Sequence, residues 1–316
     1  MKKYALLFML MLFMQHAFAG KPVKEWGKLQ VISTQLCDQY GRPVVLRGVS
    51  LGWHNIWPRF YNKGAVKALA TDWHANVIRA AMGIKIEDNY LENPSFAKQC
   101  VETVVKAAIK NDVYVIMDWH AHETYTKEAK EWFGYFAKKY GKHPHIIYEI
   151  FNEPVNQSWE SLKEYAREVI TEIRKYDPDN VILVGCPHWD QDIDVVAASP
   201  LTGFTNIMYT VHFYAATHGS YLRNKMVEAH KTLPIFVSEC AGMEASGNGP
   251  LNYPEWQQWI DTMERERISW VNWSVSDKDE TCSMLLPRAK ADGQWPEDVI
   301  KEYGKKVKSN LLKYNK

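Results

Sequence analysis

The chain has 316 residues, of which 46% are hydrophobic, so it can bury the core of one α/β barrel or of two smaller domains. Its 38 Lys and Arg residues balance 37 Asp and Glu residues, which excludes the strongly charged surface that attracts nucleic acids or anionic membranes and favours a neutral substrate. The 13 Trp and 17 Tyr residues provide flat amphipathic rings that suit sugar rings, although tryptophan-rich cores use the same residues.

The first residues have the pattern of an export signal. Lys2-Lys3 precedes an apolar run over residues 4–13, and Ala17-Phe18-Ala19 offers a small-x-small cleavage site. The apolar run is too short for a lasting membrane anchor. We therefore expect a signal peptide over residues 1–19 and a secreted or periplasmic mature chain from residue 20. An uncleaved membrane tether is the alternative.

The cysteines follow this segment and are odd in number, so at least one thiol stays unpaired even in an oxidising compartment. They are Cys37, Cys100, Cys186, Cys240 and Cys282. No Cys-x-x-Cys pair or Cys/His spacing indicates zinc, and no metal site is expected.

One motif repeats along the mature chain: a short apolar strand, a loop and an amphipathic helix. Residues 28–40, followed by Gly41-Arg42-Pro43, predict an N-terminal hairpin. Strands are then predicted at residues 44–49, 77–82, 113–118, 146–151, 181–184, 207–213, 234–238 and 269–273. Because no linker or low-complexity segment interrupts these units, the sequence predicts a single (β/α)8 TIM barrel over residues 20–316 rather than a doubly wound sheet.

Polar side chains collect at the carboxyl ends of the predicted strands, where barrel enzymes place their chemistry. The strand 146–151 ends in Asn152-Glu153 and the strand 234–238 ends in Glu239, which indicates an acid/base pair. Other strands supply Arg79, His120, His212, Tyr214 and Trp273. Each residue has a structural alternative, such as a buried ion pair, a core histidine or a helix cap. Together on one rim, they are more typical of a catalytic pocket.

At these residues the chain resembles glycoside hydrolase family 5, and within it the endo-β-1,4-glucanases (cellulases) of subfamily 2. The matching segments are residues 46–48, 76–82, 115–120, 147–154, 212–219 and 269–280, and the similarity spans roughly residues 29–295. The resemblance implies Glu153 as the acid/base and Glu239 as the nucleophile.

The resemblance also implies a set of sugar-binding residues. The residues that match the family's supporting positions are Arg79, His120, Asn152, His212, Tyr214 and Trp273. Trp189 would stack on the leaving-group side, and Trp57 would line the non-reducing side. Lys278 and Glu280 resemble hydroxyl-binding residues, with a solvated loop as the alternative. The usual histidine after the first strand aligns with Gly52, so His54 is expected to substitute for it.

Retaining hydrolysis of a glycosidic bond requires two carboxyl groups about 5 to 5.5 Å apart, one ionised and one protonated. Arg79 would keep Glu239 ionised, whereas burial beside a like charge would raise the pKa of Glu153. Tyr214 could hydrogen-bond to Glu239, and Asn152 to the 2-hydroxyl of the sugar. This chemistry needs no metal ion or organic cofactor.

Two positions depart from the family pattern: Gly83 stands where many relatives carry tyrosine, and Cys240 where they usually carry tryptophan. Cys240 follows Glu239, and Cys282 lies in the loop after the last strand. Loops that follow neighbouring barrel strands come within reach of one another. We therefore predict a disulfide between Cys240 and Cys282 over the rim, with two unrelated thiols as the alternative.

The sequence thus predicts a secreted, monomeric endo-β-1,4-glucanase whose partner is a β-glucan polysaccharide or oligosaccharide. A family 5 hydrolase acting on mannan, xyloglucan or lichenan is the nearer alternative, because these enzymes share the catalytic set. A non-catalytic sugar-binding barrel would predict the loss of one glutamate, and a metal-dependent hydrolase would need three ligands at workable spacing.

Overall fold

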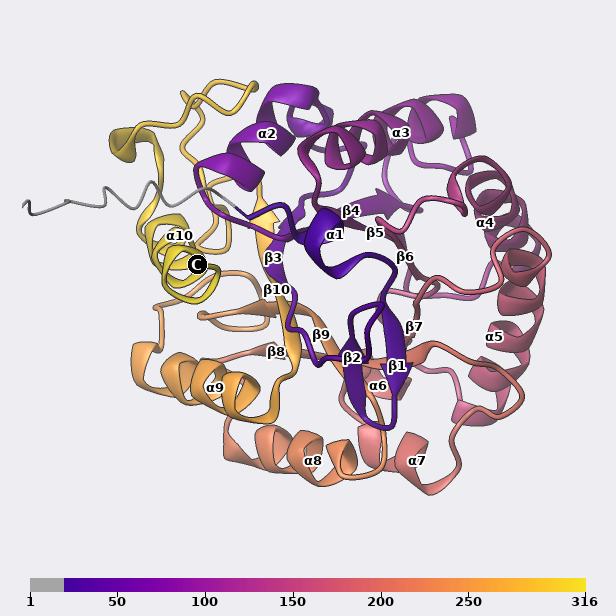
Figure 1. Ribbon diagram of the computed structural model, residues 1–316. Coiled ribbons are helices and arrows are strands. Elements are labelled where there is room, and N and C mark those ends of the chain that lie inside the picture. Colours follow the sequence, from indigo (N-terminus) through magenta and orange to yellow (C-terminus); the bar gives the residue numbers. More distant parts are fainter. Residues whose placement is uncertain (1–19) are drawn as a thin grey trace, which may run out of the picture.

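The computed structural model describes residues 20–316, which form a closed barrel of eight parallel strands surrounded by helices (Figure 1). Around the barrel the strand order is β10-β3-β4-β5-β6-β7-β8-β9. The strands are β3 (Arg47–Leu51), β4 (Val77–Gly83), β5 (Tyr114–His120), β6 (Ile146–Glu149), β7 (Ile182–Val184), β8 (Ile207–Tyr214), β9 (Ile235–Ala241) and β10 (Ser269–Val275). The predicted TIM barrel is confirmed. The predicted signal peptide, residues 1–19, lies outside the described residues.

The helices pack around the barrel, most of them on its outer face, and the first lies across its amino-terminal end (Figure 1). They are α1 (Pro22–Trp26), α2 (Lys63–Thr71), α3 (Pro94–Asn111), α4 (Thr126–Tyr140), α5 (Trp159–Arg174), α6 (Pro187–Asp190), α7 (Ile193–Ala198), α8 (Ser220–His230), α9 (Tyr253–Glu266) and α10 (Glu302–Tyr314), with 3-10 turns η1 (Pro58–Phe60) and η2 (Glu297–Val299). No helix among residues 20–316 is long and apolar enough to cross a membrane.

Helix α5 illustrates how the sequence sets a helix. The side chain of Ser158 caps its first turn by accepting a hydrogen bond from Ser161 N at 3.2 Å. The apolar residues at helical spacing are buried: Leu162, Tyr165, Ala166, Val169, Ile170 and Ile173. The helix ends at Arg174, three residues before Asp177-Pro178, because a proline disfavours a helical conformation in the residue before it.

The amino-terminal end of the barrel is closed by the predicted hairpin, β1 (Gln30–Ile32) and β2 (Gln35–Cys37), which crosses the front of the barrel in Figure 1. Residues 44–46, expected to begin the first barrel strand, instead lie beside this hairpin, since Val44 N donates to Leu36 O at 2.9 Å. Leu36 and Leu46 pack there in one apolar cluster with Phe236 and Val271 from inside the barrel.

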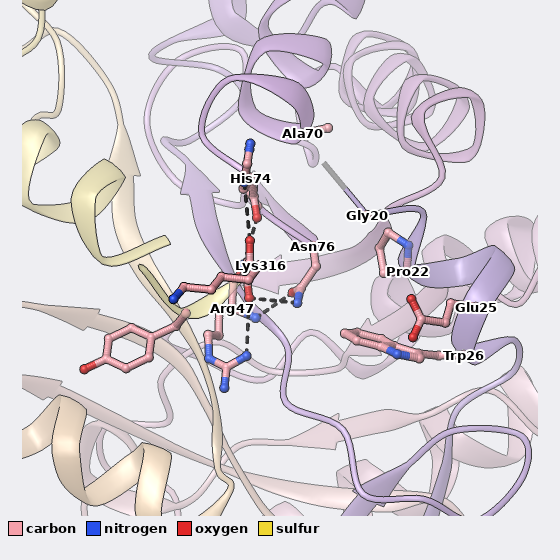
Figure 2. A pocket seen from close by; sticks show the side chains of 12 residues that line it. Gly20, Pro22, Glu25, Trp26, Arg47, Ala70, His74, Asn76 and Lys316 are labelled. Atoms are coloured by element: carbon pink, nitrogen blue, oxygen red, sulfur yellow. Dashed lines mark hydrogen bonds between the residues drawn. The ribbon is translucent and has the colours of Figure 1, made fainter. Parts of the chain in front are cut away.

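Both termini of the described chain meet at the same end. A small hollow of about 100 Å³ lies between the first and last described residues, and it is lined by Trp26, Arg47, His74 and Lys316 among others (Figure 2). Asn315 crosses it, because its Nδ2 donates to Arg47 O at 3.1 Å and to His74 O at 2.8 Å. These contacts seal the amino-terminal end, which leaves the carboxyl end of the strands open to a ligand.

Candidate active site

The carboxyl ends of several strands bring the predicted polar side chains together. Those expected at the rim are Arg79 on β4, His120 on β5, Asn152 and Glu153 after β6, His212 and Tyr214 on β8, Glu239 on β9 and Trp273 on β10. The pairing of β8 with β9 sets His212 opposite Glu239. One side-chain atom each from Glu153, His212 and Glu239 lie within 4.8 Å of one another. The two glutamates predicted from the strand ends therefore form a close carboxyl pair.

Arg79 is the fixed cation of this site and is fully buried. Its guanidinium donates to both oxygens of Glu149, at 2.6 and 3.2 Å, and to Asn152 Oδ1 at 2.6 Å. It also lies 3.0 Å from Asp118 Oδ2 and 3.0 Å from Glu239 Oε2. Burial alone would lower the pKa of Arg79, but the carboxylates, led by Asp118, raise it well above its ordinary value. The arginine is therefore charged at every relevant pH.

Glu239 is held through both of its carboxylate oxygens. Oε1 accepts a hydrogen bond of 2.7 Å from the Tyr214 hydroxyl, and Oε2 accepts one of 3.0 Å from Arg79 Nη1. These are the two partners that the sequence predicted for this carboxylate. Two bonds from different strands fix its plane, so the group is preorganised for reaction at a single point.

Glu153 differs from its expected state. Its Oε1 lies 2.9 Å from Nδ1 of His212. Burial raises the pKa of Glu153, as we predicted, but the hydrogen bond and charge of His212 outweigh burial and lower it below its ordinary value. The prediction of a raised pKa was wrong because it left out the histidine. In the free protein, His212 and Glu153 form an ion pair that holds one proton.

His120 and Trp273 form a stacked pair at the rim. The ring centroids are 5.1 Å apart with an interplanar angle of 14°. Nδ1 of His120 lies 2.7 Å from Asp118 Oδ2, which fixes the tautomer, and burial followed by the charge of Arg79 lowers the pKa of His120 to about 3. Trp273 thus rests on a neutral, immobile imidazole and stays half-exposed.

The side-chain amide of Asn152 has one donor that is available to bind a ligand. Its Oδ1 accepts from Arg79, which orients the amide, and its Nδ2 is buried without a hydrogen-bond partner among residues 20–316. A buried donor without a partner is costly, so a ligand oxygen at this point would gain a bond that the free protein lacks. This is the geometry required of the predicted contact to a sugar hydroxyl.

A cavity of about 330 Å³ adjoins Glu153 on the side of the β7 and β8 loops. It is lined by Glu153, Trp189, Gln191, His212, Tyr214, His218 and Ala245. Trp189 is 40% exposed. The ring therefore borders the cavity beside the acid/base candidate, where the resemblance placed a stacking surface.

Trp57 lies on the other flank of the rim. Its half-buried ring covers Gly52, which follows β3, and Gly52 N donates to Val275 O at the end of β10. Lys278 and Glu280 lie in the loop after β10, and they form an ion pair with each other. The structure places all three residues at the carboxyl end of the barrel, and their part in sugar binding stays a prediction.

Two predictions about site residues are wrong. His54 has 0% of its surface exposed, and its Nδ1 accepts from Gly83 N at 3.0 Å, so it is a core histidine that cannot reach a sugar. Cys240 and Cys282 are free buried thiols rather than a disulfide. The Cys240 sulfur lies 3.3 Å from Val271 O, between strands, whereas the Cys282 sulfur lies 3.5 Å from Glu280 Oε2 in the loop.

Sequence reasoning missed two residues of the site, His122 and Asp190. Nδ1 of His122 lies 3.4 Å from Glu153 O and 4.0 Å from its Oε2. Asp190 lies behind His212 with its Oδ2 3.3 Å from Nε2. The position of His122, two residues after His120 at a strand end, was a usable signal. Nothing in the sequence marked Asp190.

Among residues 20–316, the one cluster that could ligate a metal is Glu153, His212 and Glu239. Both oxygens of Glu239 already accept hydrogen bonds, one of them from the Arg79 cation. A permanent positive charge 3.0 Å from a proposed ligand atom opposes the binding of a second cation. The donor set fits a carboxyl pair better than a metal centre.

Two carboxyl groups at this separation, beside exposed aromatic rings at the open end of a barrel, define a class of protein: the glycoside hydrolases. Residues 37–279 match the model of the cellulase family, glycosyl hydrolase family 5, and the chain belongs to this family.

Relatives in this family are endoglucanases. The chain is 41% identical to an endoglucanase of Clostridium saccharobutylicum over 90% of this chain and 65% of that protein. It is 39% identical to endoglucanase Z of Dickeya dadantii over 98% of this chain and 73% of that protein. The chain thus spans about two thirds of the length of these curated relatives.

The fold comparison agrees. The catalytic domain of Thermobifida fusca endoglucanase Cel5A superposes with a TM-score of 0.89 at 36% identity, covering 93% of this chain and all of that domain. A variant of the same domain has been solved with cellotetraose, with a TM-score of 0.89 at 35% identity, over 93% of this chain and 100% of that chain. A protein from Cytophaga hutchinsonii is 43% identical with a TM-score of 0.91, over 93% of this chain and 97% of that one.

Proposed function

We propose that this chain is an endo-β-1,4-glucanase that hydrolyses internal bonds of cellulose and related β-glucans with retention of configuration. The observation that carries the proposal is the close approach of Glu153, His212 and Glu239, within 4.8 Å, at the open end of a family 5 barrel. Retaining glycosidases hold their two carboxyl groups about 5 to 5.5 Å apart, whereas inverting ones leave roughly 6.5 to 9.5 Å for a water molecule.

In the first step Glu239 attacks the anomeric carbon while the bond from that carbon to the leaving oxygen breaks. The leaving oxygen takes the proton that Glu153 and His212 hold between them. Arg79 and Tyr214 keep the attacking carboxylate in one orientation. The products of this step are a glycosyl-enzyme ester and a free sugar hydroxyl.

In the second step a water molecule replaces the departed sugar. The Glu153–His212 pair, which gave up its proton in the first step, takes a proton from this water through Glu153, and the water oxygen attacks the anomeric carbon and releases Glu239. Two displacements on opposite faces return the original configuration. The spare Nδ2 donor of Asn152 supplies a bond to the 2-hydroxyl that strengthens as positive charge develops on the ring.

A substrate of linked glucose units is favoured by the named relatives, which are endoglucanases, and by the cellotetraose complex of a homologous domain. Mannan, xyloglucan and lichenan stay as alternatives that share the same chemistry. A reducing-sugar assay on cellulose, lichenan, xyloglucan and mannan separates them. We expect the highest rate on soluble β-1,4-glucan, and a higher rate on mannan would overturn the substrate assignment.

The roles of the two glutamates are tested by rescue. Glu239→Ala should abolish turnover, and added azide should restore it with an azide product of inverted configuration. Glu153→Ala should spare aryl cellobiosides with very good leaving groups, because these need little acid assistance. Equal residual activity of both variants on activated aryl substrates contradicts the assignment.

The proposal includes export and a monomeric state. Export is supported by the basic and apolar pattern of residues 1–19 and by the small-x-small triplet before Gly20. N-terminal sequencing of protein recovered outside the cytoplasm should begin at or near Gly20. Light scattering of that protein should give the mass of one chain.

A further inference from the structure

Asp190 is a buried carboxylate that has no part in the double displacement as described. It ends the short helix α6, and the backbone at His188, Trp189 and Asp190 is left-handed, with φ of 58°, 54° and 59°. Trp189 is 40% exposed in this turn, whereas Asp190 is 0% exposed. The turn is tied to the loop of the acid/base candidate, because Trp189 N donates to Pro154 O at 2.8 Å.

The two oxygens of Asp190 have different surroundings. Oδ1 accepts a short hydrogen bond from Cys186 N, which holds the turn closed. Oδ2 has no hydrogen-bond partner among residues 20–316 and lies 3.3 Å from Nε2 of His212. Among residues 20–316 no lysine or arginine pairs with Asp190, and burial raises the pKa of this carboxyl well above its ordinary value. The charge of His212, 3.3 Å away, is the main influence that opposes burial and favours the ionised carboxylate, so Asp190 and His212 share one proton.

His212 connects Asp190 to the acid/base. Its Nδ1 lies 2.9 Å from Glu153 Oε1, and its Nε2 lies 2.9 Å from Ser238 Oγ and 3.8 Å from Glu149 Oε1. Nδ1 therefore faces a carboxylate, and Nε2 faces the Ser238 hydroxyl with the carboxyl groups of Asp190 and Glu149 close behind it. An imidazole with a proton on each nitrogen can donate on both sides.

Other ionisable groups also surround His212. They are Glu149 and Glu153 from β6 and its loop, Glu239 from β9, Asp118 from β5 and His218 after β8. Arg79 of β4 pairs with Asp118, Glu149 and Glu239. Arg79 already neutralises Glu149 and Glu239 through direct hydrogen bonds. The charge of Asp190 has no such partner, and of the carboxylates around His212 it has the largest effect on the imidazole.

We propose that Asp190 is a positioning residue for the Glu153 acid/base, and that by holding His212 charged it determines how tightly the His212–Glu153 pair keeps its proton. This inference rests on the proposed function and deepens it. Burial alone would lower the pKa of His212, whereas the neighbouring carboxylates, led by Asp190, raise it well above its ordinary value. Asp190 thereby extends to higher pH the range over which the pair holds a proton for the leaving group.

The substitution that tests this is Asp190→Asn, because the amide oxygen can still accept from Cys186 N while the charge is lost. Removing a negative charge beside the imidazole weakens proton binding by the His212–Glu153 pair. The alkaline limb of kcat/KM on cellotetraose should therefore move to lower pH by about one unit or more, a tenfold loss of rate on that limb. On dinitrophenyl cellobioside, whose leaving group needs no proton, this shift should disappear.

A second readout does not depend on turnover. In protein labelled with ¹⁵N-histidine, the His212 ring signals, identified by their loss in His212→Gln, should show an imidazolium that loses its proton at lower pH in Asp190→Asn than in the wild type. Asp190→Ser, which also removes the charge, should give the same shift. Asp177→Asn is the matched control, because Asp177 is equally buried but accepts from Tyr148 and Asn180 away from the site.

An unchanged alkaline limb together with an unchanged His212 titration in both Asp190 variants overturns the inference. A structural role alone would lower thermal stability without moving either titration. If the wild type hydrolyses no β-glucan but the His212 titration still shifts, the proposed function fails and the link between Asp190 and His212 stands.

Discussion

Replacing Arg79 with methionine should be the most damaging single change outside the catalytic glutamates. Methionine has a similar length and no charge, so it removes the cation and leaves Asp118, Glu149 and Glu239 facing one another in a buried site. Removing one partner from a buried ion pair costs about 3 to 5 kcal/mol. For a domain of this size each kcal/mol lowers the melting temperature by about 2 to 4 °C, so we expect a decrease of about 6 to 20 °C.

The pH dependence of this loss has a definite sign. Burial alone would raise the pKa of Glu149, but Arg79 outweighs burial and lowers it to about 2. A carboxylate whose pKa is lower in the folded than in the unfolded protein stabilises the fold above its unfolded pKa, near 4.3, and loses that contribution as the pH falls toward 2. The gap between wild type and Arg79→Met should therefore be full at pH 6 and shrink between about pH 4 and pH 2.

Thermal unfolding followed by circular dichroism across this range measures the gap. Arg288→Met is the matched control, because Arg288 pairs with Asp298 on the surface, where an ion pair contributes about 0 to 1 kcal/mol. A melting temperature of Arg79→Met within about 2 °C of the control at pH 6 would refute the account of Arg79 as the charge that organises the site.

Other predictions concern the rim, the thiols and the core. Trp189→Ala and Trp57→Ala should weaken binding of long cello-oligosaccharides more than of short ones in calorimetric titrations, because each ring serves a remote subsite; an unchanged chain-length dependence would remove them from the groove. Activity should survive dialysis against a chelator, and loss that added metal restores would contradict a metal-free mechanism. Mass spectrometry of unreduced, denatured protein should find Cys240 and Cys282 alkylated and not cross-linked. Burial lowers the pKa of His54 to about 4, so the folded protein should lose stability as the pH falls from about 6.5 to 4, and His54→Asn should flatten that slope.

The fold could be predicted because strands buried on both faces have a strong sequence signal. Every residue of β4, β5, β8 and β9 is buried, and most residues in each of these strands are apolar. The boundaries failed where polar residues lie inside a strand. β9 continues through Glu239 to Ala241, and β5 continues to His120, because backbone pairing with the neighbouring strands does not depend on the polarity of the side chain.

The site could be predicted where a polar residue lies in or directly after a recognisable strand. Arg79, Glu153 and Glu239 have that signal. The sequence carried no such signal for the pKa of Glu153, because this pKa depends on His212. His212 is distant in the sequence and comes close to Glu153 only when the barrel closes. Asp190 carries no signal at all, because its inward direction comes from three consecutive left-handed residues that no glycine or turn motif announces.

The disulfide prediction was wrong because it considered which loops are neighbours and left out the direction in which each strand side chain points. Successive side chains of a strand point to opposite faces, so Glu239, which points into the barrel, requires Cys240 to point outward into the layer between strands and helices. There the Cys240 sulfur contacts Val271 O. Cys282 instead lies in the loop above, where its backbone N donates to Gly247 O. A residue that directly follows a catalytic strand residue therefore belongs to the packing around the site. A bridge to the rim would have to start one residue further along the strand, where the side chain points inward again.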